Sequence, residues 1–126
     1  MSRVVRRKLP EKPTSPQAAQ SPTALAIRSN LQVSQGLFAR LIPVSVRSLA
    51  TLESGTPPTP AVSRRLTELQ RLIDALAEVI RRDALGSWLQ NPNEAFGGLK
   101  PFEVIERGES DRVWAMIYFL RAGVPS

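Results

Sequence analysis

The sequence contains no cysteine and no histidine among its 126 residues. Without cysteine the chain forms no disulfides or thiolate metal sites, and a reducing cytoplasm is the expected compartment. Without histidine it lacks the usual general base near neutral pH and the commonest metal ligand. Beyond the N-terminal cluster the lysines are Lys12 and Lys100, and the sequence shows neither a glycine-rich phosphate loop nor a motif of paired carboxylates. We therefore expect a protein that is not an enzyme and that uses no cofactor or metal.

Long hydrophobic runs are also missing. No apolar stretch approaches the roughly eighteen residues that a membrane-spanning helix requires. The basic N-terminus is not followed by an apolar segment, so neither a secretory signal nor a membrane partner is expected. Hydrophobic residues make up 42% of the chain and charged residues 22%, as in ordinary globular proteins. The length suits one domain, or two small helical modules that share a core.

Charge is unevenly distributed along the chain. The formal net charge is +6; residues 1–65 hold ten Lys/Arg and two acidic residues, whereas residues 66–126 hold seven and nine. A basic front half suggests a polyanionic partner such as nucleic acid. The alternative is a cationic tail that only keeps the protein soluble.

Residues 1–22 predict a disordered basic arm. The segment contains four prolines, which break helices, and a positive cluster of Arg3, Arg6, Arg7 and Lys8. Such an arm either lies along nucleic-acid phosphates or is a solvated tail without a partner.

Short capped helices are predicted in residues 23–60. One lies near Thr23–Asn30, a second begins after the N-cap Ser34, and a third at Val46–Ser54 follows the N-cap Ser45. Two short helices joined by three or four residues form a helix-turn-helix pattern. The proline-rich segment 56–60 marks a module boundary.

A long helix and a small helical unit are predicted in the second half. From about Ala61 to Arg82, apolar residues recur at spacings of three and four, namely Leu66, Leu69, Ile73, Leu76 and Ile80. This seam predicts an intramolecular core, with dimerisation as a second use. Three further helices are expected at Ala84–Gln90, from Pro101 to Gly108 and at Glu109–Ala122. The predicted fold class is all-α: a helix-turn-helix bundle, a long helix and a small C-terminal helical domain.

The last of these helices is apolar around its whole circumference. Residues 113–120 read VWAMIYFL, whereas a surface helix of a small domain has a polar face. We expect one side to pack inside and the other to meet a partner; a fully central helix is the alternative.

A family resemblance is carried by two segments: Trp88-Leu89-Gln90-Asn91-Pro92-Asn93 and Ala95-Phe96-Gly97-Gly98-Leu99-Lys100-Pro101-Phe102-Glu103-Val104-Ile105. They resemble the toxin-binding domain of Xre/MbcA/ParS-type antitoxins, where Trp-Leu, Pro-Asn, a small-aromatic-Gly segment and Pro-Leu-Glu follow in order. The resemblance covers about residues 62–126. Residues 34–55, with Ser34-Gln35, Phe38-Ala39-Arg40, Val44-Ser45, Leu49 and Glu53-Ser54-Gly55, look like an Xre-type helix-turn-helix.

This resemblance implies the antitoxin of a type II toxin–antitoxin system. The partner would be a cognate toxin of the RES-domain type, which resembles ADP-ribosyltransferases and consumes NAD. The antitoxin would cover the entrance to the toxin's active site, act as a homodimer within a toxin–antitoxin hetero-oligomer, and repress its own promoter by binding operator DNA. The expected domains are a basic arm at 1–22, a DNA-binding helix-turn-helix at 23–60 and a dimerisation and toxin-binding domain at 61–126.

Several residues depart from the Xre pattern. Gln32 and Pro43 stand where glycine is common, Leu52 stands where tryptophan is usual, and Gly36 lies inside a helix, where it costs roughly 1 kcal/mol relative to alanine. A proline ring holds φ near about −65°, so it should not reach the positive φ of that glycine. We therefore expect a different turn and a tilted recognition helix, and we rank toxin neutralisation above promoter binding.

The expected DNA-binding residues lie around the third helix. Arg47 is the only long donor there and would contact a guanine edge or a phosphate; an ordinary exposed arginine is the alternative. Gln35 resembles the position that contacts backbone phosphate in many Xre proteins. The other expected contacts are Arg40, Ser45, Val46, Ser48 and Thr51, with Arg64 and Arg65 adding non-specific attraction.

The expected toxin-binding residues lie in the last helix and the chain end. Trp114, Tyr118 and Phe119 are predicted interface residues because aromatic side chains concentrate binding energy, while Trp88, Phe96 and Phe102 are assigned to the core. Arg121 or the terminal carboxylate would occupy the place of a phosphate or of its partner. The extended end Val124, Pro125 and Ser126 would fill a deep NAD cleft, or is a frayed terminus.

Two alternatives remain. One is a stand-alone Xre-family transcriptional regulator that uses its C-terminal half only to dimerise. The other is an orphan antitoxin that binds toxins but not DNA, which the proline at position 43 favours.

Overall fold

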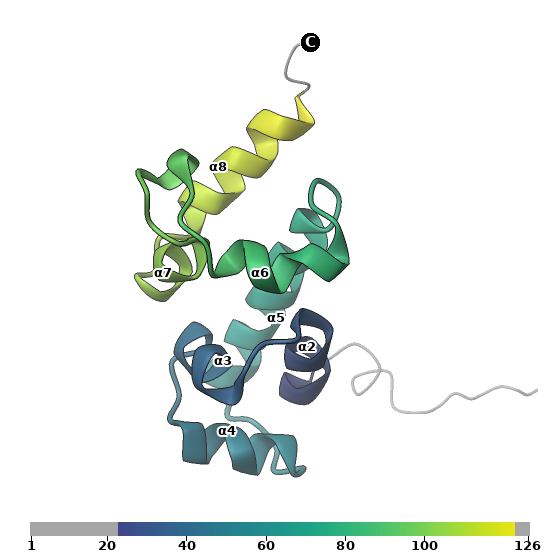
Figure 1. Cartoon of the computed structure of the whole chain (residues 1–126). Helices are drawn as coiled ribbons and strands as arrows, with labels where there is room; N and C mark the ends of the chain where they lie inside the picture. Colours follow the sequence, from purple (N-terminus) through teal and green to yellow (C-terminus); the bar gives the residue numbers. More distant parts are fainter. Residues whose placement is uncertain (1–22, 123–126) are drawn as a thin grey trace, which may run out of the picture.

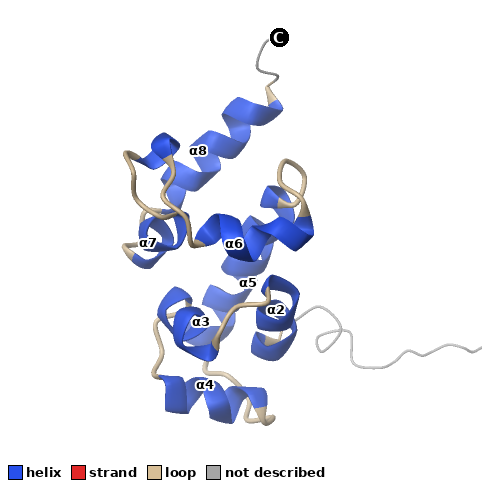
Figure 2. Ribbon diagram, viewed as in Figure 1, coloured by secondary structure: helices blue, strands red, loops and turns tan. Residues whose placement is uncertain are grey.

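The computed structural model describes residues 23–122, and every regular element in this range is a helix (Figure 2). The expected all-α fold is confirmed. The α-helices are α2 (Ala24–Leu31), α3 (Gln35–Leu41), α4 (Val46–Glu53), α5 (Pro60–Leu76), α6 (Leu85–Leu89), α7 (Pro101–Glu106) and α8 (Ser110–Arg121). Two 3₁₀ helices, η2 (Arg82–Ala84) and η3 (Glu94–Phe96), lie between them. The predicted basic arm at 1–22 lies outside the described residues.

Hydroxyl side chains determine where the first four of these helices begin. Thr23, Ser34, Ser45 and Thr59 are the N-caps of α2 to α5, and each side-chain oxygen accepts a hydrogen bond from a backbone N–H three residues later, at 3.0–3.2 Å. Each such cap typically stabilises a helix by about 1 kcal/mol. The predicted starts of the second and third helices are therefore confirmed.

Helix α5 ends earlier than the sequence pattern predicts. It stops at Leu76 instead of continuing to Arg82, and residues 77–80 form turns before η2. The predicted end is wrong because the chain reverses here, which brings Leu85 and Leu89 of α6 into the core. The seam of α5 is used inside the chain: its buried residues are Leu66, Leu69, Leu72, Ile73, Ala75 and Leu76.

Helix α5 runs through the middle of the molecule, with α2, α3 and α4 at one end and α6, α7 and α8 at the other (Figure 1). Contacts between α3 and α7 and between α5 and α8 join the two ends. One hydrophobic core runs through both, and Phe38, Leu49, Val104 and Ile117 are completely buried in it. Residues on both sides of the boundary expected near residue 60 thus share one core. Among the described helices, none combines the length and apolar character needed to cross a bilayer.

The turn between α3 and α4 corrects the expectation for Pro43. Its φ is +21°, so the proline does take a positive φ. Buried side chains on both sides of the turn, Phe38 and Ile42 before it and Leu49 after it, fix how α3 packs against α4, and the N–H of Val44 donates to the carbonyl of Ala39 at 3.0 Å. Contacts between α3 and α4 on either side of the turn accompany this strained value of φ.

Candidate functional site

Helix α8 has one buried side and one open side. Val113 and Ile117 are completely buried against the core. At about 100° per residue, Ala115, Tyr118 and Phe119 lie on the opposite side, and the exposed fractions of the two aromatic residues are 63% and 68%. The helix is therefore not central, which rules out the alternative of a fully buried last helix.

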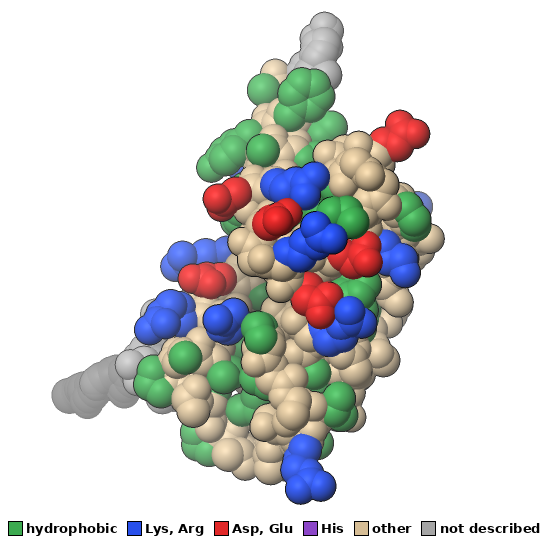
Figure 3. Space-filling view, turned by 90° about the vertical axis from the view of Figure 1, so that its left-hand side faces the viewer, with side chains coloured by type: hydrophobic (Ala, Val, Ile, Leu, Met, Phe, Trp, Pro, Cys, Tyr) green, Lys and Arg blue, Asp and Glu red, His purple; other side chains and the backbone are tan. Residues whose placement is uncertain are grey.

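The exposed apolar residues gather at the C-terminal end of α8. Leu120 follows Tyr118 and Phe119 and is 42% exposed. This end projects from the rest of the molecule (Figure 1), and hydrophobic side chains cluster at that end in the space-filling view (Figure 3). Contiguous apolar surface of this kind typically marks a contact site for another macromolecule.

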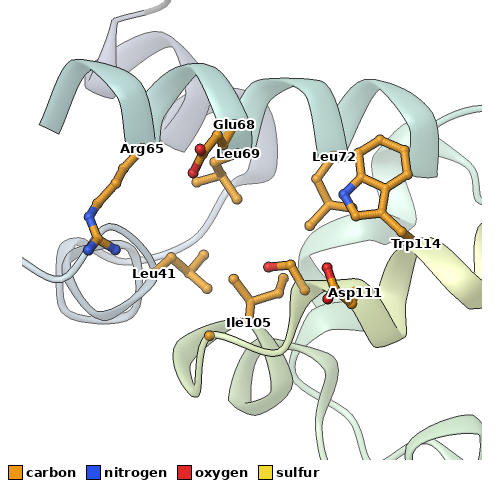
Figure 4. Close-up of a pocket in the computed structure, with 10 residues that line it drawn as sticks. Leu41, Arg65, Glu68, Leu69, Leu72, Ile105, Asp111 and Trp114 are labelled. Atoms are coloured by element: carbon orange, nitrogen blue, oxygen red, sulfur yellow. The ribbon is translucent and has the colours of Figure 1, made fainter. Parts of the chain in front are cut away.

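Trp114 lies half-buried beside this surface. Its ring centroid is 6.4 Å from that of Tyr118, with the planes tilted by 36°. It borders a hollow of about 410 Å³ between α5 and the α7–α8 pair (Figure 4). The apolar lining is Leu41, Leu69, Leu72, Ile105 and Trp114, and the charged side chains at its edge are Arg65, Glu68 and Asp111.

Arg121 forms an ion pair that ties the end of α8 to the turn after α5. Its Nη2 lies 2.6 Å from Oε1 of Glu78. Both side chains are more than a third exposed, so the pair adds little stability and is accessible to competition. The other residues predicted for this site, Val124, Pro125 and Ser126, lie outside the described residues.

The remaining aromatic residues lie where the sequence predicts them. Phe96 and Phe102 are buried, and the half-buried Trp88 ring meets the Phe96 ring edge-on at 6.3 Å. None of the three is part of the exposed aromatic surface of α8.

At the opposite end of the molecule, α4 presents most of its surface to solvent. Leu49 is its single buried residue, and the exposed side carries Val46, Arg47, Ser48 and Thr51. The hydroxyl groups are used locally: Ser45 Oγ caps the helix and donates to Ser48 Oγ, and Thr51 Oγ1 donates to backbone carbonyls of α4. Arg47 has no ion pair within residues 23–122.

Gln35 is engaged in a hydrogen-bond network among α2, α3 and α4. Its Nε2 donates to Oε1 of Glu53 at 2.8 Å, and Arg28 donates to both oxygens of the same carboxylate. The hydrogen bond from Arg28 is the main cause that lowers the pKa of Glu53, and the Gln35 bond acts in the same direction. The network joins α2, α3 and α4. Sequence analysis missed it because its members are 18 and 25 residues apart, beyond any helical spacing.

Arg40 faces the C-terminal half of the molecule. Its Nε and Nη2 donate to the two carboxylate oxygens of Glu106 at 2.9 and 3.0 Å, and its guanidinium carbon lies 4.9 Å from the centre of the Phe102 ring. Arg40 thus joins α3 to α7, and we leave it out of the proposed DNA-binding surface. No group of metal-binding side chains occurs within the described part of the chain.

Comparison with known proteins places this arrangement in context. No protein-family model matches the sequence. The chain is 36% identical over 85 residues to the mycobacterial cidal antitoxin MbcA of Mycobacterium bovis. The matched segment covers 67% of this chain and 75% of the relative. The MbcA antitoxin of Mycobacterium tuberculosis gives the same identity and coverage.

A solved structure resembles the fold as a whole. A chain in the crystal structure of the M. tuberculosis MbcT–MbcA toxin–antitoxin complex matches with a TM-score of 0.67 at 28% identity, covering 90% of this chain and 100% of that chain. These similarities agree with the family that the segment 88–105 resembles. The chain belongs to the MbcA family of antitoxins.

Proposed function

We propose that this protein is the antitoxin of a type II toxin–antitoxin pair and that it neutralises a cognate toxin by binding it. Membership of the MbcA family supports the proposal, because a related chain of similar fold occurs in a toxin–antitoxin complex. The observation that carries it is the exposed aromatic surface of α8, formed by Tyr118 and Phe119. The role is binding and not catalysis.

The exposed area of these two side chains is large enough to matter energetically. An aromatic side chain presents roughly 150–250 Å² of surface, and both rings are more than three-fifths exposed in the free chain. At about 25 cal/mol per Å², covering them would contribute several kcal/mol before the costs of association. Trp114, half-buried beside them, gives the surface a rigid edge.

The partner in this proposal is a RES-type, NAD-consuming toxin whose active-site entrance the antitoxin covers. Helix α8 projects from the body, so its end can reach a concave surface (Figure 1). Arg121 would exchange Glu78 for an acidic group of the toxin, which costs little because the existing pair is exposed. Val124, Pro125 and Ser126 would extend the contact into the cleft.

The test is growth of cells that express the protein encoded by the adjacent reading frame, with and without this antitoxin, while cellular NAD is followed. We expect growth arrest and falling NAD with the neighbour alone, and relief of both when the antitoxin is present. A neighbour that is harmless when expressed alone would overturn the proposal and favour the stand-alone regulator. Arrest with constant NAD would retain neutralisation and reject the RES-type chemistry.

Operator binding with repression of its own promoter is the second proposed activity. It is supported by the solvent-facing side of α4, where Arg47 is unpaired within the described range. Ser45, Val46, Ser48 and Thr51 border it, although their hydroxyl groups already have partners inside α4. Base readout would therefore depend mainly on Arg47. A homodimer is part of this proposal, and since the α5 seam is buried, a second copy would use another surface.

Binding to a fluorescent duplex from the chain's own promoter region tests this activity. We expect Arg47→Ala to weaken binding by about tenfold or more. Arg71→Ala, which removes an exposed arginine from α5, should change the affinity little. Equal affinities of Arg47→Ala and the wild type at physiological salt would show that α4 does not contact the operator.

A further inference from the structure

One side of α8 combines a carboxylate with two aromatic rings. Asp111, Trp114 and Tyr118 are three and four residues apart, so they lie on the same side of the helix. Together with Ala115 they line an open hollow of about 500 Å³. Asp111 and Trp114 also line the hollow of about 410 Å³ against α5 (Figure 4), so the two hollows share these two residues.

The Asp111 carboxylate has no partner of its own within residues 23–122. It is exposed and takes part in no ion pair or side-chain hydrogen bond there. The adjacent Arg112 contacts other groups. Its Nη1 lies 2.9 Å from Oε1 of Glu109, and its guanidinium carbon lies 5.9 Å from the centre of the Phe96 ring. No cation of the described chain thus satisfies Asp111.

We propose that this side of α8 is a binding site for an arginine side chain of the toxin. The inference rests on the proposed function and adds the chemistry of the group that is recognised. A guanidinium is planar: its N–H groups bond a carboxylate in pairs while its face stacks on an aromatic ring. Asp111 supplies the carboxylate, and Trp114 and Tyr118 supply two neighbouring rings whose centroids are 6.4 Å apart.

The adjoining hollow determines what flanks that arginine. Its walls are mainly aliphatic, from Leu41 and Leu69 to Leu72 and Ile105, and Arg65 lies at the end away from Asp111 (Figure 4). A second cation at that end would be repelled, whereas an apolar side chain would bury surface. The matching toxin segment therefore carries one arginine next to apolar residues.

Affinity for the protein encoded by the adjacent reading frame, measured by titration calorimetry, tests the site. We expect Asp111→Asn to raise the Kd by about tenfold or more, because the arginine would lose its charged partner, and the effect should shrink at high salt. Asp83→Asn is the matched control: it removes the same charge from an exposed ion pair with Arg81 that lines neither hollow. It should leave the Kd within about twofold of the wild-type value.

A loss of helix stability could imitate this effect, since an acidic residue in the first turn also favours the helix N-terminus. Asp111→Glu retains the charge and should keep most of the affinity. Trp114→Leu keeps an apolar side chain but removes the ring face, and should weaken binding by about fivefold or more. Thermal unfolding of each free variant shows whether it is folded at the temperature of the titration.

Substitutions on the toxin identify the guanidinium itself. When its surface arginines are changed to lysine one at a time, one change should raise the Kd for wild-type antitoxin and have no further effect with Asp111→Asn. The inference is overturned, with neutralisation intact, if Asp111→Asn binds like Asp83→Asn or if no arginine couples to Asp111. If the wild-type chain does not bind the neighbouring protein, the proposed function fails and the inference fails with it.

Discussion

At the scale of single residues, two turns hold non-glycine residues at positive φ. Gln32 ends α2 with φ +58°, and its N–H donates to the carbonyl of Arg28 at 2.8 Å. Pro43 lies between α3 and α4 with φ +21°. A glycine adopts the left-handed φ of Gln32 at little cost, whereas a side chain is strained there, and a proline ring is strained at any positive φ.

Replacing the proline should therefore stabilise the protein. We expect Pro43→Gly to raise the free energy of unfolding by about 1 kcal/mol, as the relief of strain exceeds the larger entropy that glycine gives the unfolded chain. Urea denaturation measures the change. Pro92→Gly, at a proline without positive φ, should lower stability; a lower stability of Pro43→Gly as well would show that residue 43 is unstrained.

Single residues also show what local sequence predicts. Ser34 and Ser45 precede apolar helices and cap them as expected, because a capping bond spans three residues. The φ of Pro43 could not be predicted in this way, because the packing of side chains on either side of it, such as Phe38 and Leu49, decides the turn.

At the scale of helices, two carboxylates join elements that are distant in sequence. Glu53 holds α4 to α2 and α3 through Arg28 and Gln35, and Glu106 holds α7 to α3 through Arg40. The latter partners are 66 residues apart. No helical spacing connects such pairs, so composition predicts an all-α chain but not these contacts. The early end of α5 was missed for the same reason.

The first of these links gives stability a defined pH dependence. The pKa of Glu53 is lowered in the folded protein from an ordinary value of 4.5, mainly by the hydrogen bond from Arg28. The stability that ionised Glu53 contributes to the fold is thus fully present above pH 4.5 and is lost as the pH falls through the lowered pKa. Glu53→Gln should cost about 1–3 kcal/mol at pH 7 and less at about pH 3, which is below the ordinary value of 4.5.

Unfolding of both proteins by urea at the two pH values measures this difference. Glu78→Gln, which breaks an exposed pair with Arg121, should cost less than about 1 kcal/mol at either pH. A loss for Glu53→Gln that is the same at both pH values would show that ionisation of Glu53 does not contribute.

Helix α6 lies very close to the end of α2 at Gly86, and this leads to a further prediction about stability. A Cβ atom on Gly86 would lie 2.3 Å from the backbone carbonyl oxygen of Leu31. Gly86→Ala should therefore lower the free energy of unfolding by about 1–3 kcal/mol. In α3, Gly36 has open space, with Ser34 Oγ nearest at 3.8 Å, so Gly36→Ala should raise it by up to about 1 kcal/mol. Thermal unfolding of the two variants measures both changes in stability. Equal effects of Gly86→Ala and Gly36→Ala would contradict the close approach at Gly86.

At the scale of the whole molecule, two exposed surfaces lie at opposite ends of one core. Helix α4 presents Arg47 at one end, and α8 presents Tyr118 and Phe119 at the other (Figure 1). The contacts between α3 and α7 and between α5 and α8 make the ends parts of a single body. A toxin on α8 would thus leave α4 open to DNA.

Sequence predicted the family and the apolar character of the last helix, because both depend on short ordered motifs. It did not predict which side of α8 is buried, since an all-apolar helix has no periodicity to indicate it. In the structure the side of α8 that carries Val113 and Ile117 is buried, and Tyr118 and Phe119 are exposed to solvent.

The most direct test of the central claim is the affinity of the variant with both Tyr118→Ser and Phe119→Ser for the protein encoded by the adjacent reading frame. We expect its Kd to rise by about thirtyfold or more, with an unchanged unfolding temperature because both side chains are exposed. Leu25→Ser, at an exposed apolar residue of α2, should bind like the wild type. Wild-type affinity of the double variant would show that the aromatic end of α8 is not the toxin-binding surface.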